Sequence, residues 1–183
     1  MEKEIRTVKV ANSKFSEEEK PSFYDIKIDD EGNVFYYNEK GELHRLNGPA
    51  TEWADGTKQW YYNGKRHRLD GPAVEWSDGS KFWYQNDKQH RLGGPAIEWG
   101  NGDKWWCYEG KKHRLDGPAV EWWEGHKEWY WYDARHRLDG PAIEWADGKK
   151  EWWVNNKLIG KSKKGFTQED FERWKKEHGY ENS

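Results

Sequence analysis

The sequence predicts an all-β protein: an antiparallel array of β-hairpins with a period of 23 residues, followed by a capping α-helix at the C-terminus. The triplet His-Arg-Leu occurs five times, at residues 44–46, 67–69, 90–92, 113–115 and 136–138. Each copy starts 23 residues after the previous one. A fixed period of this length indicates supersecondary units that bury their apolar surface by stacking on their neighbours. We therefore expect five clear copies and a degenerate one before them.

Each copy is predicted to contain one tight hairpin turn. In the second copy Asp78-Gly79 lies between two short β-prone runs. Asp-Gly favours a two-residue type I′ turn, in which both central residues have positive φ. The equivalent pairs are Asp55-Gly56, Asn101-Gly102, Glu124-Gly125 and Asp147-Gly148, of which only Glu124 departs from this preference. A looser connection such as Asn63-Gly64-Lys65 follows, and then the His-Arg-Leu triplet, a Gly and a Pro.

A two-residue turn fixes which side chains share a face of the sheet. Trp76 would oppose Lys81 and Val74 would oppose Trp83, so these four side chains would lie together. This set barely changes between copies, so we predict that it is the stacking face. Its lysines could each lie over a cross-strand indole. They are Lys58, Lys81, Lys104, Lys127 and Lys150.

The opposite face would hold three columns that vary between copies. Phe82, Trp105, Trp123 and His126 place bulky groups on a face that elsewhere tolerates Ser, Ala and Gly. Two interpretations stay open for these four residues. They are exposed or lightly packed aromatic side chains, or they form a patch that binds a protein partner.

Composition bounds the class of protein. Leu, Ile, Val and Phe together number 25 of 183 residues, and 36% of residues are charged, which is also typical of disordered chains. A net charge of only −3, with 15 Trp and 10 Tyr, favours a folded array whose core uses indoles. The small net charge gives no general attraction to nucleic acid or anionic lipid. The single Cys107 excludes an internal disulfide, and no apolar run predicts a signal peptide or a membrane span. We therefore expect a cytoplasmic protein.

The two ends of the chain depart from the repeat. We predict an N-terminal tail at 1–22, a repeat domain at 23–160, and a linker with a helical cap at 161–183. The degenerate copy is one residue longer than the others between its turn glycine and the first His-Arg-Leu triplet.

A helix is predicted near residues 168–178. Thr167 is suited to cap its N-terminus, with Asp170 three residues later, and Phe166 and Phe171 have the spacing of a hydrophobic staple. Gly179 would end the helix. We expect this helix to cover the open edge of the sheet.

The repeated histidines do not predict a metal site or an enzyme. Equivalent histidines in neighbouring copies would lie two strands apart, roughly 9–10 Å, whereas zinc ligands lie about 2.0–2.1 Å from one ion. No nucleophile recurs beside them, and Asp70 becomes Asn47 and Gly93 in other copies. We therefore expect no catalytic residue, metal or cofactor. The His would close the connecting turn, and the Arg would bind carbonyls or pair with Glu52, Glu75, Glu98, Glu121 and Glu144.

A small-molecule site is the alternative function. Repeated arginines and aromatic rings could hold a phosphate and stack on a base. The repeated glutamates and the negative net charge oppose a long nucleic acid, which leaves a small nucleotide or signalling molecule. Its candidate contacts are Arg45, Arg68, Arg91, Arg114, Arg137, His67, His90 and His113.

The repeat resembles the MORN repeat at Asn63-Gly64-Lys65-Arg66-His67-Arg68-Leu69-Asp70-Gly71. It departs from the usual Tyr-x-Gly-x-Trp opening, whose place is taken by Lys58-Gln59-Trp60-Tyr61-Tyr62. It is closer to MORN-variant repeats of bacterial and phage proteins with His-Arg-x-Asp-Gly-Pro-Ala, some of them antitoxins. The resemblance covers about residues 32–160 and implies a sheet-like binding scaffold.

We therefore predict a non-enzymatic binding protein that captures and inhibits a protein partner, in an antitoxin-like or phage counter-defence role. The phospholipid role attached to some MORN proteins finds no basic patch in this sequence, and no membrane partner is expected. Pairing with a second copy stays open, because a single layer of strands would leave many indoles in contact with water.

Overall fold

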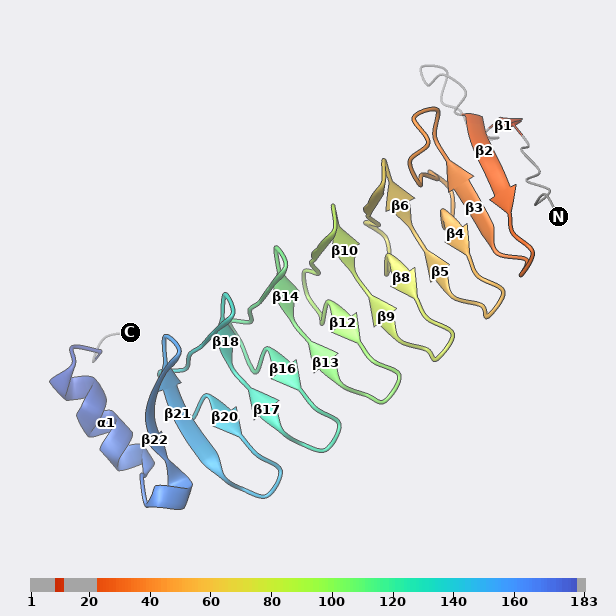
Figure 1. Ribbon diagram of the computed structural model, residues 1–183. Helices are drawn as coiled ribbons and strands as arrows, with labels where there is room; N and C mark the ends of the chain where they lie inside the picture. The colour runs from red at the N-terminus through yellow and green to blue at the C-terminus, as the bar shows by residue number, and fades with distance from the viewer. Residues whose placement is uncertain (1–8, 12–22, 181–183) are drawn as a thin grey trace. The chain divides into compact units, whose positions relative to one another are not determined.

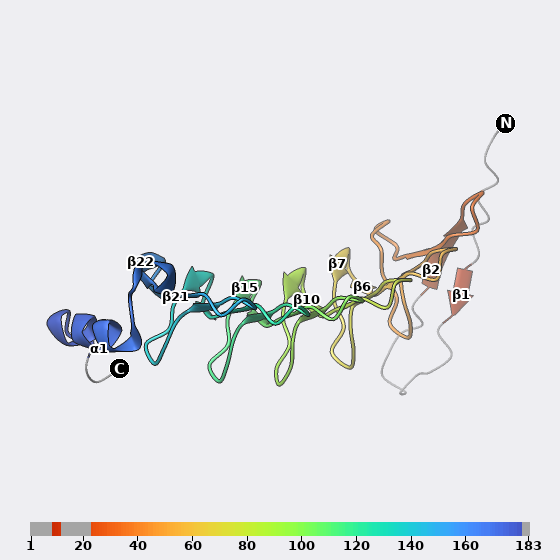
Figure 2. The ribbon, with the colours of Figure 1, turned by 90° about the horizontal axis from the view of Figure 1, so that it is seen from below.

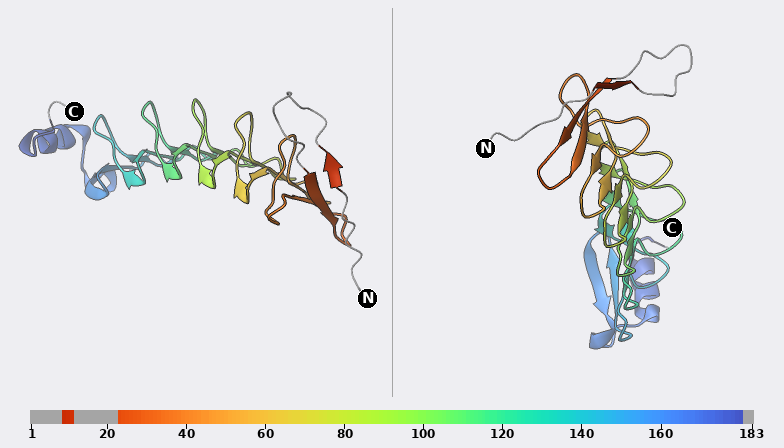
Figure 3. Two further views of the ribbon diagram at one scale, coloured as in Figure 1. Left: turned by 90° about the horizontal axis from the view of Figure 1, so that it is seen from above. Right: turned by 90° about the vertical axis from the view of Figure 1, so that its right-hand side faces the viewer.

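The computed structural model describes residues 9–11 and 23–180 (Figure 1). It divides into two units, Met1–Gln89 and His90–Ser183, in each of which the strands form a single antiparallel layer (Figures 2 and 3). The predicted all-β hairpin array with a C-terminal helical cap is confirmed. The predicted N-terminal tail lies outside the described residues, except for Lys9–Ala11, which forms a strand.

The first unit contains eleven described strands. They are β1 (Lys9–Ala11), β2 (Phe23–Ile28), β3 (Val34–Tyr37), β4 (Thr51–Glu52), β5 (Lys58–Gln59), β6 (Tyr61–Tyr62), β7 (Lys65–Arg66), β8 (Val74–Glu75), β9 (Lys81–Phe82), β10 (Tyr84–Gln85) and β11 (Lys88–Gln89). The sheet order is β1-β2-β3-β4-β5-β8-β9, and β6–β7 and β10–β11 are separate two-stranded hairpins.

The second unit repeats this plan and ends in helices. Its elements are β12 (Ile97–Glu98), β13 (Lys104–Trp105), β14 (Cys107–Tyr108), β15 (Lys111–Lys112), β16 (Val120–Glu121), β17 (Lys127–Glu128), β18 (Tyr130–Trp131), β19 (Ala134–Arg135), β20 (Ile143–Glu144), β21 (Lys150–Val154), β22 (Lys157–Lys161), the 3-10 turn η1 (Ser162–Lys164) and α1 (Gln168–Glu177). The sheet order is β12-β13-β16-β17-β20-β21-β22, with small hairpins β14–β15 and β18–β19.

The main hairpin turn differs from the prediction. The amide of Trp76 donates to the carbonyl of Ser80 at 2.9 Å, and the amide of Gly79 donates to the carbonyl of Trp76 at 3.0 Å. The loop therefore has three residues, and only Gly79 among them has positive φ, at 87°. This is a type I turn followed by a left-handed glycine, the usual three-residue hairpin loop. All five clear copies share the pattern.

The type I′ turn lies instead in the connection that was predicted to be loose. Asn63 and Gly64 have φ values of 48° and 74°, and Tyr62 opposes Lys65 across them. The equivalent pairs, 86–87, 109–110, 132–133 and 155–156, also have positive φ at both residues. Each copy is therefore a main hairpin with a three-residue loop and a small hairpin with a two-residue turn.

One extra loop residue reverses the predicted faces. Val74 opposes Phe82, and Glu75 opposes Lys81, because a shift of one residue moves every side chain of a strand to the other face. The predicted stacking face is therefore wrong, since Val74 and Trp83 do not oppose each other. Phe82 is instead packed into the buried Val/Ile face and is only 8% exposed.

The buried interior is aliphatic rather than aromatic. The buried apolar residues that recur from copy to copy are the alanine after each Pro and, in four copies, the Val or Ile that follows it. They are Ala50, Ala73, Ala96, Ala119, Ala142, Val74, Ile97, Val120 and Ile143. The indoles before each main loop stay more than a third exposed, for example Trp76 and Trp99. They flank the core, so the expectation that indoles replace aliphatic side chains inside it is wrong for this column.

The other face carries a ladder of alternating charges. Glu75 lies between Lys58 and Lys81 on its two neighbouring strands, and Glu121 lies between Lys104 and Lys127. Opposite charges directly across a sheet stabilise pairing. Arginines lie over the indoles Trp60, Trp106 and Trp129. The lysines lie opposite glutamates instead, so their predicted placement over cross-strand indoles is wrong.

The degenerate copy, which precedes the five clear ones, has a longer small hairpin. The amide of Asn38 donates to the carbonyl of Glu42, and the amide of Gly41 donates to the carbonyl of Asn38, both at 2.9 Å. The connection is therefore a three-residue loop where later copies have the two-residue turn. This accounts for the additional residue that the sequence shows before His44.

The C-terminal helix begins and ends close to the predicted residues. The Thr167 side chain accepts a hydrogen bond from the Asp170 amide, and the Asp170 carboxylate accepts one from the Thr167 amide, which completes the capping box. Phe166 and Phe171 belong to one apolar cluster, as expected for a staple. The helix lies at the β22 end of the sheet (Figure 1). It packs through Phe171 on Trp152 and Val154 of β21.

Gly117→Ala should destabilise the fold by about 1–3 kcal/mol, because an added Cβ would lie 2.9 Å from the Arg114 guanidinium carbon. The φ of this glycine is not positive, so the penalty comes from lost space. Gly100→Ala is the matched control, since Ala54 and Ala146 occupy its column in other copies. It should change stability by less than about 0.5 kcal/mol. Chemical denaturation measures both, and equal stability of the two variants would contradict this packing role.

Candidate binding surface

The residues that follow each His form a loop held by its own arginine; we call residues 68–72, and their equivalents in the other copies, the Arg-Leu loop. The Nε of Arg68 donates to Asp70 Oδ1 at 2.8 Å, and NH1 donates to the Pro72 carbonyl and to Glu75 Oε1, both at 3.2 Å. Its guanidinium lies 4.1 Å from the centre of the Trp60 ring, within cation–π distance. One side chain therefore joins the loop to the sheet beneath it.

The contacts with the proline carbonyl and the strand glutamate recur in every clear copy, and the predicted Arg–Glu pairing is confirmed. The contact with a loop Asp is found in the second, fourth and fifth copies. The NH1–Oε1 distances are 2.7 to 3.2 Å for Arg45–Glu52, Arg68–Glu75, Arg91–Glu98, Arg114–Glu121 and Arg137–Glu144. The hydrogen bond from the arginine lowers the pKa of Asp70, Asp116 and Asp139 in their loops. These carboxylates stay ionised and largely exposed at neutral pH.

The repeated histidines join consecutive copies. The Nδ1 of His44 accepts a hydrogen bond from the amide of Asn63 at 3.0 Å, and that of His90 accepts one from Glu109 at 3.2 Å. The amide donor is the first residue of the type I′ turn that follows the His in the chain. Each of these histidines therefore closes the type I′ turn after it, and not the turn directly before it. Burial lowers the pKa of His44, which favours the neutral ring that this acceptor role requires.

The fourth copy is an exception. The Nδ1 of His113 is buried and has no hydrogen-bond partner among the described residues. Its ring stacks on Tyr132, with 4.1 Å between centroids and 20° between planes. Stacking here replaces the polar link of the other copies.

In the second, third and fourth copies the leucine of the loop is the most exposed apolar side chain. Leu69, Leu92 and Leu115 are 77%, 76% and 77% exposed. The last member, Leu138, packs against the cluster that holds α1 and is partly buried. The exposed leucines bury little surface within their own chain, so they contribute little to the stability of the fold.

Grooves lie between successive Arg-Leu loops. One groove in the first unit has a volume of about 570 Å³ and is bounded by Leu46 and Leu69, with Trp60 and Tyr62 between them. A groove of about 790 Å³ in the second unit is lined by the equivalent residues three copies later. Each groove thus combines two leucines and at least two aromatic rings with charged side chains of both signs, arginine as well as aspartate.

The predicted partner-binding patch is placed differently from expectation. Phe82 is buried, and Trp105 and His126 are partly buried on either side of Trp122, with ring centroids 6.1 and 6.2 Å from it. Trp123 is the exposed member, at 65%. Phe82 therefore cannot meet a partner, because the register turns it into the sheet interior.

One predicted variable column links copies and does not form a free surface. The Thr57 hydroxyl accepts a hydrogen bond from the Ser77 amide at 3.2 Å, and the Asp103 carboxylate accepts one from the Trp123 amide at 2.9 Å. Thr57 and Asp103 are buried. Variation in this column therefore changes the linking acceptor.

The residues of the alternative nucleotide site are already engaged. All five arginines form the ion pairs described above, and Arg68, Arg114 and Arg137 also lie over indoles. His67 and His90 each accept a backbone hydrogen bond through Nδ1. A base and a phosphate would have to displace these contacts.

A buried charged cluster is found where the second copy has Phe82. The Glu128 carboxylate accepts hydrogen bonds from the Tyr130 hydroxyl at 2.7 Å and from Arg135 Nε at 3.2 Å. His126 Nε2 lies 3.2 Å from Glu128 Oε1 but is not aligned for a hydrogen bond. Burial would raise the pKa of Glu128, but the Tyr130 hydrogen bond and the Arg135 charge lower it overall. Burial and then Glu128 raise the pKa of Tyr130 to about 12.

Neither protein-family models nor curated proteins match the sequence. Within residues 9–11 and 23–180, no group of three or more His, Cys, Asp or Glu side chains is placed to hold a metal ion. None of the helices in this part of the chain has the length and apolar character needed to cross a bilayer.

Glu128→Gln should lower stability at pH 7 by about 1–3 kcal/mol, because it removes the buried carboxylate that accepts hydrogen bonds from Tyr130 and Arg135. The pKa of Glu128 is lower in the folded than in the unfolded state, so its contribution is complete above the ordinary carboxyl pKa. That contribution is lost as the pH falls through the lowered value.

The difference between wild type and Glu128→Gln should therefore shrink from pH 7 to pH 3 in chemical denaturation. Glu124→Gln, at an exposed position four residues earlier, should match wild type at both pH values. A difference that does not depend on pH would contradict the assigned ionisation.

Proposed function

We propose that this protein is a non-enzymatic scaffold that captures another protein through its exposed Arg-Leu loops. The observation that carries the proposal is the exposure of Leu69, Leu92 and Leu115 in loops whose backbone is held by an arginine. Full burial of a Leu contributes about 1.5–3 kcal/mol, which the fold leaves unused and a partner could gain.

Repetition supports a protein rather than a small molecule as the partner. Within each unit, equivalent loops recur every two strands, roughly 9–10 Å apart, so one extended surface can contact neighbouring loops in register. The loops are held before binding, which reduces the ordering cost of association. Leu and aromatic side chains in each groove are typical of residues that fill pockets at interfaces.

We further propose that capture inhibits the partner, in an antitoxin-like or phage counter-defence role in the cytoplasm. The MORN-variant resemblance supports this role, and a repeated surface that covers a partner over several loops would block its own contacts. Cys107 is the single cysteine of the sequence and cannot form an internal disulfide, which is compatible with a reducing compartment. The nucleotide alternative has less support, because the Arg and indole groups it needs already bind each other.

The triple variant Leu69→Asp, Leu92→Asp and Leu115→Asp should keep its fold and lose partner capture at least 100-fold. The positions are exposed, so each change should alter stability by less than about 0.5 kcal/mol. Affinity purification of tagged protein from bacterial cells, followed by native mass spectrometry, measures the bound partner.

The matched control adds the same three carboxylates at exposed main-loop positions, through Ala54→Asp, Ser77→Asp and Ala146→Asp. Capture that is lost only in this control would place the partner on the main-loop surface beside Trp123. Capture that is unchanged in both variants would overturn the assignment to the Arg-Leu loops. Co-purification of a compound of a few hundred daltons in place of a protein would favour the nucleotide alternative.

A further inference from the structure

We propose that the segment received by the exposed Arg-Leu loops is an amphipathic helix that presents an aromatic residue followed directly by Lys. The inference rests on the proposed function and specifies the chemistry of the partner. Its basis is the contact that α1 makes with the last loop of the same chain.

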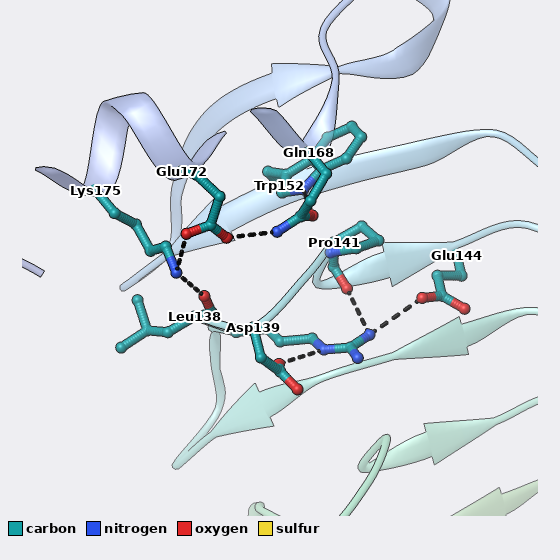
Figure 4. Close-up of polar contacts among 9 residues, drawn as sticks. Leu138, Asp139, Pro141, Glu144, Trp152, Gln168, Glu172 and Lys175 are labelled. Carbon is teal, nitrogen blue, oxygen red and sulfur yellow. Dashed lines mark hydrogen bonds and ion pairs between the residues drawn. The ribbon is translucent and has the colours of Figure 1, made fainter. Parts of the chain in front are cut away.

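The helix α1 contacts the last Arg-Leu loop through both apolar and polar groups. Phe171 is fully buried on Trp152 and Val154, and Trp174 and Leu138 pack against this cluster. Lys175 Nζ donates to the Leu138 carbonyl at 2.8 Å and lies 2.9 Å from the Glu172 carboxylate (Figure 4). Lys175 therefore contacts the loop directly, and the adjacent Trp174 packs against the same apolar cluster as Leu138.

The earlier loops have the same geometry without a helix on them. Arg68 and Arg114 bind their loop carboxylate, proline carbonyl and strand glutamate as Arg137 does (Figure 4), at distances that agree within 0.1 Å. Leu69 and Leu115 remain 77% exposed. Their carbonyls accept no hydrogen bond from another described residue. The carbonyl acceptor that Lys175 uses and an exposed leucine are thus present and open in these copies.

The loop carboxylates favour a cationic residue on the partner, and the copies should differ in their affinity for it. Lys175 contributes to the lowered pKa of Asp139 in the occupied loop, after the larger effect of Arg137. Asp70 and Asp116 hold the equivalent positions and are highly exposed. The first and third copies have Asn47 and Gly93 instead. A Lys beside the aromatic residue should therefore bind the second and fourth loops in preference to the first and third.

The groove of the second unit supports this arrangement. It is bounded by Leu115 and Leu138, and Lys175 of α1 already lines it. A second helix lying over Leu115 would face the α1 side of the same groove. The groove of the first unit is lined by residues at equivalent positions of the repeat, and none of them belongs to a helix.

The test uses the full-length protein and a synthetic peptide with the sequence of residues 164–180, stapled between the exposed positions 173 and 177. The staple fixes the helix, since a free helix of this length is marginal in water. The protein carries labelled Leu methyl groups, and its spectra are recorded during titration. We expect saturable shifts at Leu69 and Leu115, smaller shifts at Leu92, and no shift at Leu138, which packs against the cluster that holds α1.

Variants of the peptide and the protein complete the test. A peptide with Trp174→Ala or Lys175→Ala should bind at least 10-fold more weakly, whereas Lys176→Ala, on the exposed side of the helix, should bind as the parent does. Asp70→Asn with Asp116→Asn in the protein should remove the preference for these loops over Leu92.

Shifts confined to Leu138 would mean that the peptide only exchanges with α1, and would overturn the inference. Absence of saturation, or formation of a dimer of the chain in place of a peptide complex, would overturn it as well. The proposed function fails separately, when the three Leu→Asp changes leave partner capture intact. Loss of capture in that variant, with no peptide binding, would retain the scaffold and reject the helical partner.

Discussion

The arrangement of each copy depends on one arginine side chain. In every copy it donates to a carbonyl of its own loop and pairs with a glutamate on the next strand. In the second, fourth and fifth copies it also binds a loop carboxylate and lies on an indole. These groups would be poorly ordered separately, because the strands they join are only two residues long. The planar fork of Arg can meet all of them at once, and a Lys could not. The glycine after the loop carboxylate leaves room for it, and the exposed leucine is a consequence of that fixed loop.

The period, the copy number, the helical cap and the Arg–Glu pairs were predictable because each leaves a direct mark on the sequence. The turn types were not, because Asp-Gly suits two loops of different length. In a type I′ turn both residues have positive φ, whereas the three-residue loop needs it only at the glycine. Glu124 in the place of Asp was evidence for the three-residue loop, since only the glycine is kept in all copies. Asn63-Gly64 carried the type I′ signal in the position taken as a loose connection.

The error in the turn propagated to the site. A shift of one residue exchanged the faces, so Phe82 was predicted on the surface and is buried. The exposed leucines were missed although the sequence contains a signal for them. Leu69 and its equivalents are invariant apolar residues outside both hairpins, in a segment rich in polar and turn-forming residues. The α1 contact could not be inferred from sequence, because it joins residues 37 positions apart through a backbone carbonyl.

The histidine links have a consequence for how such a chain can change in evolution. Each link joins a ring to an amide 19 residues later, within the span of one repeat. Duplication or loss of one 23-residue unit would therefore recreate every link and every loop without any compensating substitution. The number of leucines that can contact a partner would then change by one with each repeat gained or lost. The degenerate copy at one end and the helical cap at the other would stay as they are. Copy number would then act as a heritable setting of avidity, separate from the chemistry of any single loop.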